Sequence, residues 1–417
     1  MNRWHQNAPS PRMNNRKGAT PMEDYKALSQ EHIFNTYARL PVTFVRGKGC
    51  RLWDDNDKEY LDFLAGIAVC NLGHCNPEVT RVLCEQADTL IHVSNLFYTR
   101  PQIELAAELT RLSFADKVFF SNSGAEANEA AIKLARKYSK DRYGEGRFHI
   151  VTMKDSFHGR TLATLSATGQ EKVHKGFEPL VEGFAFVDFG SPAAVENAIT
   201  ERTCAVMVEP IQGEGGINLP PANYLEGLKE LCRKHDLLLI FDEVQVGMGR
   251  TGRLFAHEHY GVTPDIMTLA KALGNGLPIG AMLATNQAAE AFVPGTHATT
   301  FGGTPLVTSV ALRVLRIISE PSLLERVRET GEYLMGRLRE LQQRRPSIRE
   351  VRGLGLMVGA ELDRPGQNVV TKLLERGYVI NCTHDSVLRF VPPLVVERAE
   401  IDRLIQALDD ALAEETQ

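Results

Sequence analysis

Two strongly apolar runs of the sequence each end in a single charged residue. Asp242 closes the run LLLIFD at residues 237–242, and Lys271 closes the run IMTLAK at residues 266–271. A carboxylate buried without a partner is costly, so Asp242 is expected to face a cation or a protonated nitrogen, with a structural salt bridge as the alternative. A lysine among apolar walls can form a Schiff base with a carbonyl. For Lys271 taken alone, a solvated strand end is the alternative.

Two further polar turns follow predicted strands. Residues 122–127 (NSGAEA) precede a helix, where free amides and the helix dipole suit a phosphate. A capping box of Ser123 and Glu126 is the alternative, and it is favoured for this stretch alone. In the turn FHGRT, Phe157 and Arg160 supply an aromatic ring and a bidentate carboxylate binder. A phosphate seat, a carboxylate for a ring nitrogen, an aldehyde-binding lysine and an aromatic face are together the groups that pyridoxal phosphate requires.

These residues need a sheet that brings strand ends together. From residue 31 on, short apolar runs alternate with helical patterns, which predicts an α/β fold with a mostly parallel sheet flanked by helices. The predicted strands are residues 118–123, 148–153, 204–208, 237–242, 266–270 and 279–284. Ligands bind at the carboxyl ends of such strands, so the polar residues that follow these runs are expected to form one site.

The pattern changes near residue 306, from alternating elements to long helical stretches with a few strands. We therefore predict a large α/β domain over residues 66–306 and a smaller α+β domain built from residues 26–65 and 307–417. Residues 1–25 are rich in Asn, Pro and basic residues, which predicts a disordered tail whose two internal methionines offer alternative starts.

The composition is that of an ordinary globular protein. The 417 residues are 43% hydrophobic and 24% charged with a net charge of −5, which gives no support for binding to nucleic acid or to a membrane. Seven cysteines without a C-x-x-C pair predict reduced thiols and a cytoplasmic location. Cys70, His74 and Cys75 form the one tight Cys/His group, but no second ligand pair follows at zinc-site spacing, so we predict buried thiols and no metal.

Seven motifs in order extend this interpretation: SNSGAEANEAAIKLAR, FHGRT, EPIQGEGG, LIFDEVQVGMGRTG, TLAKALGNGLPIGA, HATTFGGTP and LRFVPPL. Over roughly residues 30–410 the chain resembles the class III pyridoxal-phosphate-dependent aminotransferases, and it is most similar to their acetylornithine aminotransferase branch. The resemblance implies a fold-type I transferase that binds pyridoxal 5′-phosphate and moves an amino group.

The resemblance also implies which residues bind the cofactor: Ser123, Gly124, Ala125, Phe157, Asp242, Glu243, Val244, Gln245, Lys271 and Thr300. Lys271 and Asp242 would be catalytic, the first as the Schiff-base lysine and proton carrier, the second as the partner of the pyridine nitrogen. Gln245 would bond the phenolate oxygen and Phe157 would stack on the ring. Thr300 would reach the phosphate of a neighbouring subunit, which implies a homodimer with shared active sites.

Substrate residues are implied in the same way. Arg160 would bind the α-carboxylate of the acetylated donor, and Arg389 that of glutamate or 2-oxoglutarate, with Thr299 near the substrate. Glu214 would pair with Arg389 and mask its charge during the other half-reaction. The alternatives are a salt bridge within the end domain for Arg389 and a solvated loop carboxylate for Glu214.

Ile67 favours an acylated substrate, because ornithine aminotransferases carry a tyrosine at the matching position for a free α-amino group. Two positions, Thr304 and Asn275, depart from the usual family residues, Asn and Gly. The sequence thus predicts an N2-acetyl-L-ornithine:2-oxoglutarate 5-aminotransferase of arginine biosynthesis. A related ω-aminotransferase for ornithine, succinylornithine, N-succinyldiaminopimelate or 4-aminobutyrate is the alternative. An inactive scaffold is disfavoured, since it has no use for Lys271.

Overall fold

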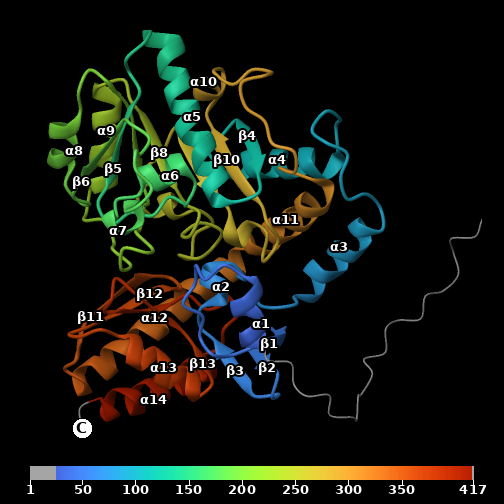
Figure 1. Ribbon diagram of the computed structural model, residues 1–417, viewed down its shortest axis with the longest axis vertical. Coiled ribbons are helices and arrows are strands. Elements are labelled where there is room, and N and C mark those ends of the chain that lie inside the picture. Colours follow the sequence, from blue (N-terminus) through green and yellow to red (C-terminus); the bar gives the residue numbers. More distant parts are fainter. Residues whose placement is uncertain (1–24, 416–417) are drawn as a thin grey trace, which may run out of the picture.

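The computed structural model describes residues 25–415, and its larger part is built on a seven-stranded sheet (Figure 1). The strand order is β4-β10-β9-β8-β7-β5-β6. Their bounds are β4 Lys117–Ser121, β5 His149–Met153, β6 Phe184–Val187, β7 Thr203–Val208, β8 Leu238–Asp242, β9 Ile266–Leu269 and β10 Gly280–Ala284. Strand β10 runs antiparallel to β4 and β9, and the pairs among β9, β8, β7, β5 and β6 are parallel. The predicted mostly parallel α/β sheet is confirmed.

Alternate side chains of the central strands enter two separate cores, which is why these strands are apolar throughout. Ala205 and Ile240 pack in the core beneath α5 (Gly124–Tyr143), with helix residues such as Leu134. Their neighbours, such as Phe241, pack in the opposite core with Leu228 of α9 (Tyr224–Lys234). The sheet is therefore covered on both faces (Figure 1).

The remaining helices surround these layers and the smaller part of the molecule. Their bounds are α1 Tyr25–His32, α2 Ala65–Ala68, α3 Pro77–Ala87, α4 Arg100–Leu112, α6 Leu162–Ala167, α7 Glu171–His174, α8 Pro192–Ala198, α10 Asn286–Ala289, α11 Pro305–Ile318, α12 Pro321–Arg344, α13 Gln367–Glu375 and α14 Arg398–Glu414, with short 3-10 turns η1 Ala256–His259 and η2 Lys271–Leu273. The long helical pattern predicted after residue 306 begins with two helices, α11 and α12, because Pro321 starts a new helix after the break at residues 319–320.

The smaller part joins segments from both ends of the chain (Figure 1). One sheet has the order β1-β2-β3-β13, with β1 Phe44–Lys48, β2 Arg51–Asp54, β3 Glu59–Asp62 and β13 Tyr378–Val379. The other has the order β11-β12-β15-β14, with β11 Ile348–Leu354, β12 Met357–Leu362, β14 Asn381–Thr383 and β15 Val387–Phe390. A core shared with α12, α13 and α14 includes Leu61, Leu338 and Leu408. Because segments from both ends of the chain share this core, the structure supports the proposed division into a large domain, residues 66–306, and a small domain made of the segments on either side.

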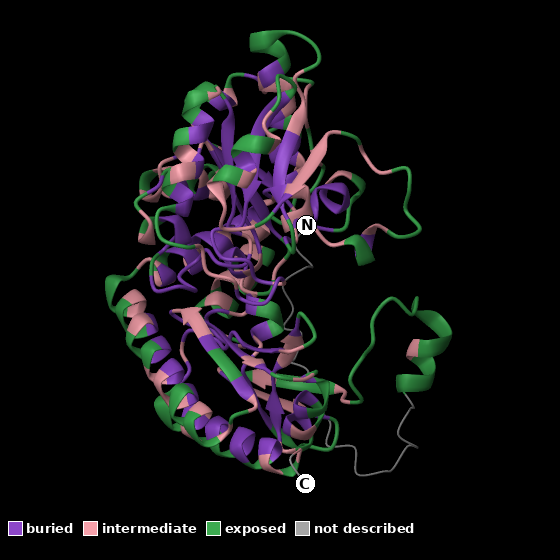
Figure 2. Ribbon diagram, turned by 90° about the vertical axis from the view of Figure 1, so that its left-hand side faces the viewer, coloured by how far each residue is buried: buried purple, intermediate pink, exposed green. Residues whose placement is uncertain are grey.

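The N-terminal helix α1 has no buried residue, and Figure 2 shows it as an exposed helix that stands away from the three sheets. Large apolar side chains just after it are also exposed, among them Phe34 and Tyr37. Residues 1–24 of the predicted tail lie outside the described residues, whereas Tyr25 already belongs to α1. No helix among residues 25–415 is long and apolar enough to cross a membrane.

Candidate active site

A cavity of about 440 Å³ lies where the parallel strands end. Strands β4, β5, β7, β8 and β9 each end in or lead to residues of its lining, such as Glu209 after β7 and Lys271 after β9. The lining consists of Val69, Asn122, Ser123, Gly124, Ala125, Asn128, Phe157, His158, Gly159, Arg160, Glu209, Asp242, Val244, Gln245, Ala270, Lys271, Gly276, Leu277, Pro278 and Ile279. The structure therefore brings most of the predicted cofactor residues to one place.

The N-terminus of α5 forms one end of this cavity. Ser123 is the N-cap, and its Oγ accepts from Glu126 N over 3.2 Å. The carboxylate of Glu126 reaches back to Asn122 N at 2.5 Å, one residue before the N-cap that a capping box would use. The N–H groups of Gly124 and Ala125 begin the helix and have no intrahelical partner, so this end of the cavity favours an anion.

Gly124 also sets how closely α5 approaches the loop after β8. A Cβ at this position would lie 2.7 Å from Cγ1 of Val244, which is closer than side chains pack. The absence of a side chain lets the helix end and Val244 meet across the cavity. The shape of the cavity at this end therefore depends on the absence of a side chain at Gly124.

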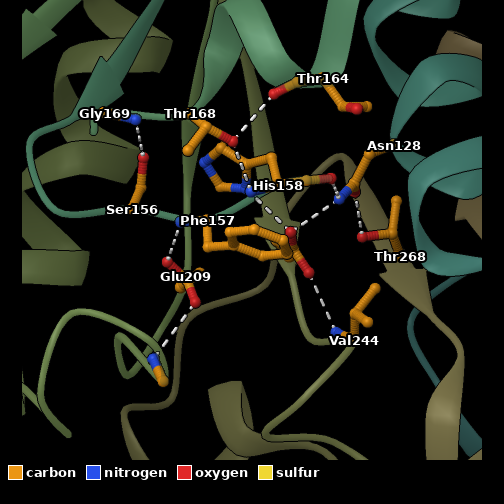
Figure 3. A network of polar contacts seen from close by, with 12 residues as sticks. Asn128, Ser156, Phe157, His158, Thr164, Thr168, Gly169, Glu209, Val244 and Thr268 are labelled. Atoms are coloured by element: carbon orange, nitrogen blue, oxygen red, sulfur yellow. Dashed lines mark hydrogen bonds and ion pairs between the residues drawn. The ribbon is translucent and has the colours of Figure 1, made fainter. Parts of the chain in front are cut away.

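Asp242 is 3% exposed and has three hydrogen-bonding partners. Its Oδ2 lies 2.8 Å from Nδ1 of His158 and accepts from Asn128 Nδ2 over 2.7 Å. Its Oδ1 accepts only from Val244 N, over 3.0 Å, among the residues that the structure describes. The neighbourhood of this carboxylate is drawn in Figure 3. The partners found for Asp242 are thus an imidazole, an amide and a backbone N–H, and its Oδ1 retains room for a further donor.

Three buried residues around Asp242 were missed by the sequence interpretation as site residues: His158, Asn128 and Glu209. Asn128 fixes the arrangement because its Oδ1 accepts from Thr268 Oγ1 over 2.7 Å while its Nδ2 reaches Asp242. Nε2 of His158 is buried without a hydrogen-bond partner in the described part of the chain. Glu209 could have been found, since it follows the apolar run CAVMV as Asp242 follows its own run.

Glu209 connects two loops of the site (Figure 3). Its Oε2 accepts from Phe157 N over 3.1 Å and its Oε1 from Gly213 N over 3.2 Å. Burial raises the pKa of Glu209 to about 7, and the negative charge of Asp242 adds to this rise. The loop that carries Phe157 and the loop that carries Glu214 are therefore held by one carboxylate.

Lys271 begins the turn η2 directly after β9 and has a φ of 43°. Burial lowers the pKa of its amine, and the positive charge of Arg389 lowers it further, against the opposing charges of Glu214 and Asp242. A lysine placed in this way holds a proton less tightly than one in water. It is suited to exchange that proton with a bound group.

Arg389 on β15 is completely buried and meets two residues of the cavity loops. Its Nη1 lies 2.6 Å from Glu214 Oε1 and 3.1 Å from Gln245 Oε1, and its Nε donates to Asn381 Oδ1 over 3.1 Å. Nη2 is buried with no partner among residues 25–415. Burial acts to raise the pKa of Glu214, but the charge and hydrogen bond of Arg389 outweigh it, so that pKa lies below its usual value. The charge of Arg389 is thus masked by Glu214.

Arg160 has the opposite setting. It is exposed and lines the mouth of the cavity, with its guanidinium carbon 5.6 Å from the centre of the Phe157 ring. The site consequently presents two arginines, one accessible and one buried and paired. Two carboxylates can be bound by such a pair at different times.

Five predicted residues do not line this cavity: Arg389 and Glu214 contact its Gln245, whereas Thr299, Thr300 and Glu243 have other surroundings. Thr299 and Thr300 line a separate cavity of about 900 Å³, together with Asn95 and Leu96, and touch the first only through Asn122 Nδ2, which donates to Thr299 Oγ1 over 3.2 Å. The carboxylate of Glu243 points elsewhere, because its Oε1 lies 2.8 Å from Nδ1 of the buried His257 and its Oε2 accepts from Ala256 N. A role for the Glu243 side chain at the cofactor therefore has no geometric support.

In the group of Cys70, His74 and Cys75, the histidine side chain bonds to an aspartate. His74 Nε2 lies 2.6 Å from Asp62 Oδ2, and the described residues contain no group of three side chains arranged to hold a metal. Cys75 is exposed and Cys70 half-buried, which corrects the prediction that both thiols are buried.

Comparisons with known proteins agree with this geometry. A family model described as aminotransferase class-III matches residues 33–412. The acetylornithine aminotransferase of Methanocaldococcus jannaschii is 52% identical over 94% of this chain and 98% of its own length, and that of Caldanaerobacter subterraneus is 51% identical over 92% and 98%.

Solved structures are similar along nearly the whole chain. The ornithine aminotransferase of Toxoplasma gondii superposes with a TM-score of 0.91 at 35% identity, covering 95% of this chain and 96% of that one. The N-acetylornithine aminotransferase of Stenotrophomonas maltophilia superposes with a TM-score of 0.82 at 38% identity, covering 94% and 99%. A further structure of the Toxoplasma protein has pyridoxal phosphate at partial occupancy in its active site.

Proposed function

Because the chain belongs to the class III aminotransferases, we propose that it transfers the 5-amino group of N2-acetyl-L-ornithine to 2-oxoglutarate. The products are N-acetyl-L-glutamate 5-semialdehyde and L-glutamate, in arginine biosynthesis. The predicted enzyme class, the fold-type I architecture and the dependence on pyridoxal 5′-phosphate are confirmed by the family and the structural neighbours. One observation supports the reaction most strongly: the accessible Arg160 lines the cavity of Lys271, and the masked Arg389 donates to Gln245 of the same lining.

The residues of the cavity fit the cofactor. The free N–H groups of Gly124 and Ala125 suit its phosphate, and Oδ1 of the buried Asp242 has room for a protonated ring nitrogen. The ring of Phe157 offers a stacking face, and Lys271 supplies the amine that binds the cofactor covalently. When bound, pyridoxal phosphate withdraws electrons from the carbon that bears the substrate nitrogen and so makes its proton acidic.

The chain's own groups then control two protons. Asp242, oriented by His158 and Asn128, holds a proton at the ring nitrogen because its carboxylate stays fixed in one position. Lys271 carries the other proton to and from the substrate carbon, since burial lowers the pKa of its amine and makes the proton easier to release. The roles of Asp242 and Lys271 both follow from their burial and from the few polar groups around them.

Two carboxylate anchors explain how one cavity serves two amino donors. Arg160 binds the α-carboxylate of acetylornithine and so directs the distant 5-amino group toward Lys271. Glutamate needs its α-amino group at the same point, so its α-carboxylate is bound deeper, by Arg389. The pair of Glu214 and Arg389, 2.6 Å apart, represents the state in which the second anchor is neutralised for the acetylated donor.

A homodimer completes the site in this proposal. Thr299 and Thr300 lie at a cavity beside exposed apolar side chains, and such a patch is typical of a surface that a second copy covers. The exposed apolar residues in the two loops at this cavity are Leu96, Phe97, Tyr98 and Phe301. In a dimer, Thr300 would reach the neighbouring cofactor's phosphate. The unpaired cysteines of the described chain suit a cytoplasmic location, which is likewise part of the proposal.

A donor panel tests the reaction. With 2-oxoglutarate as acceptor, glutamate formation is measured for acetylornithine, succinylornithine, ornithine and 4-aminobutyrate. We expect kcat/KM to be at least about tenfold higher for acetylornithine than for ornithine, because Ile67 offers no partner to a free ammonium. A preference for ornithine or 4-aminobutyrate would assign the chain to the alternative ω-aminotransferase activity.

A further inference from the structure

The segment that enters the cavity wall from the N-terminal side begins with a left-handed turn. Ala65, Gly66, Ile67 and Ala68 have φ values of 51°, 65°, 66° and 57°. Three of the four are not glycine, and Ile67 is β-branched, so each sits in a conformation that L-residues rarely adopt. Strain of this kind persists only where the surrounding contacts hold it.

Asp62, the last residue of β3, supplies those contacts. Its Oδ1 accepts from Leu64 N and from Ala65 N, each over 2.8 Å, so one oxygen caps the entry to the turn. Its Oδ2 lies 2.6 Å from Nε2 of His74, twelve residues further on. The Asp62 side chain is buried, and no other side chain in the described residues is bonded to this carboxylate. The position of His74 therefore decides where the cap lies.

His74 is itself firmly placed. Its backbone pairs with Gly49 through two hydrogen bonds of 2.9 Å, and its Cβ packs where a side chain on Gly47 would stand. The hydrogen bond to Asp62 raises the pKa of His74 to about 10, with a further rise from Cys70. The imidazole is consequently charged at neutral pH and forms an ion pair with Asp62.

The turn leads directly into the active-site cavity. Val69 N and Cys70 N both donate to Ala65 O over 2.9 Å, and the Val69 side chain lines the same cavity as Lys271. Beyond the turn, Leu72 N donates to Asn275 Oδ1 over 2.8 Å. Asn275 lies four residues after Lys271 and has a φ of 45°. The unusual Asn of this loop thus ties the turn segment to the lysine loop.

We propose that Asp62 and His74 are positioning residues whose ion pair holds the left-handed turn 65–68, and through it the Val69 wall of the substrate cavity. This inference rests on the proposed function, because it takes the cavity as the place where the amino donor binds. Without the pair, the turn relaxes toward conformations that its non-glycine residues prefer, and Val69 leaves the wall. The chemical groups around Lys271 and Asp242 stay in place, so binding suffers more than turnover.

The test compares His74→Ala with His74→Gln in the holoenzyme. For His74→Ala we expect KM for acetylornithine to rise about five- to tenfold while kcat per bound cofactor stays within about twofold. His74→Gln keeps a donor toward Asp62 and should restore most of the loss. His149→Ala is the matched control. His149 begins β5, at the end of the strand away from the cavity, so this variant should leave KM unchanged.

A second variant separates positioning from general stability. Adding Ala65→Gly to His74→Ala removes the cost of a left-handed Ala, because glycine adopts this conformation freely. The double variant should recover KM although the ion pair is still absent. If His74→Ala fails to fold, Asn275→Gly loosens the same segment without backbone strain and should raise KM in the same direction.

Two results would overturn the proposal. The first is a His74→Ala variant with an unchanged KM but a smaller amount of active enzyme. The second is a double variant, His74→Ala with Ala65→Gly, whose KM does not recover. The donor panel on the wild type keeps the two ideas apart. If the wild type uses another donor, the proposed function fails, but KM for that donor in the same variants still tests the positioning role of Asp62 and His74.

Discussion

Nη1 of Arg389 lies 2.6 Å from Oε1 of Glu214, and both side chains bond to Gln245, which lines the cavity that contains Lys271. The guanidinium is completely buried, with Gln245 as a further partner and Nη2 left without one in the described chain. A carboxylate substrate that displaced Glu214 would meet a charged fork with a free donor. The pair therefore behaves as a masked carboxylate site.

Removing the mask should shift the balance between the two half-reactions. In Glu214→Gln, no carboxylate neutralises Arg389 at any stage of the cycle. Arg389 therefore competes with Arg160 for the carboxylate of acetylornithine. We expect kcat/KM for acetylornithine to fall about tenfold and that for glutamate to hold or rise. Half-reaction kinetics with each donor check this. Equal losses in both would show that Glu214 is only structural.

Arg160→Ala should affect the opposite half-reaction. The exposed guanidinium at the cavity mouth binds one carboxylate, and the loss of such a charged hydrogen bond costs about 1.5 to 3 kcal/mol. KM for acetylornithine should thus rise about 10- to 100-fold while the glutamate half-reaction changes little. The anchor assignment is wrong if both half-reactions weaken to the same degree.

Gly124→Ala tests the phosphate end of the cavity. The added Cβ would lie 2.7 Å from Val244, so the helix end must move and carry its free N–H groups away from the phosphate. Overpacking of this kind costs about 1 to 3 kcal/mol, so we expect the Kd for pyridoxal phosphate to rise roughly tenfold or more. Gly336→Ala, where a Cβ meets no neighbouring atom, is the control. Unchanged cofactor affinity in Gly124→Ala would contradict the assignment.

The strands and the polar residues at their ends could be predicted because both leave a local pattern. Runs such as LLLIFD are apolar throughout, since alternate residues enter two cores, and Glu209, Asp242 and Lys271, which close or follow three of them, line the ligand cavity. Strand β6 was not predicted, because FAFV is short and only partly buried. The antiparallel direction of β10 also escaped, because strand direction depends on neighbours and not on composition.

The residues that orient Asp242 could not be predicted in this way. Asn128 and His158 are 114 and 84 positions from it in sequence, and only the folded sheet brings them together. Likewise, nothing in the sequence around Ile67 indicates a left-handed turn, because its residue types oppose one. The turn exists because Asp62 and His74 are placed by separate strand pairings.

His74 should make stability depend on pH. Its pKa is raised to about 10 in the folded chain by Asp62, against about 6.5 when unfolded, so its stabilising effect is complete below about pH 6.5 and is lost as pH rises toward 10. We expect His74→Gln to lower the free energy of unfolding by about 1.5 to 3 kcal/mol near pH 6.5 and by much less at pH 10.

Urea unfolding of both holoenzymes, at fixed protein and cofactor concentrations, measures this difference across the pH range. The difference between wild type and His74→Gln must shrink as pH rises. An offset that stays constant with pH would mean that His74 is neutral in the folded protein and that the ion pair does not form.

The central claim is tested most directly by a single turnover without 2-oxoglutarate. Purified holoenzyme is mixed rapidly with one donor, and the visible absorbance of the bound cofactor is followed. Acetylornithine should bleach it at least about tenfold faster than ornithine or 4-aminobutyrate, and Lys271→Ala should abolish the fast phase. A colourless protein, or faster bleaching by ornithine or 4-aminobutyrate, would contradict the account.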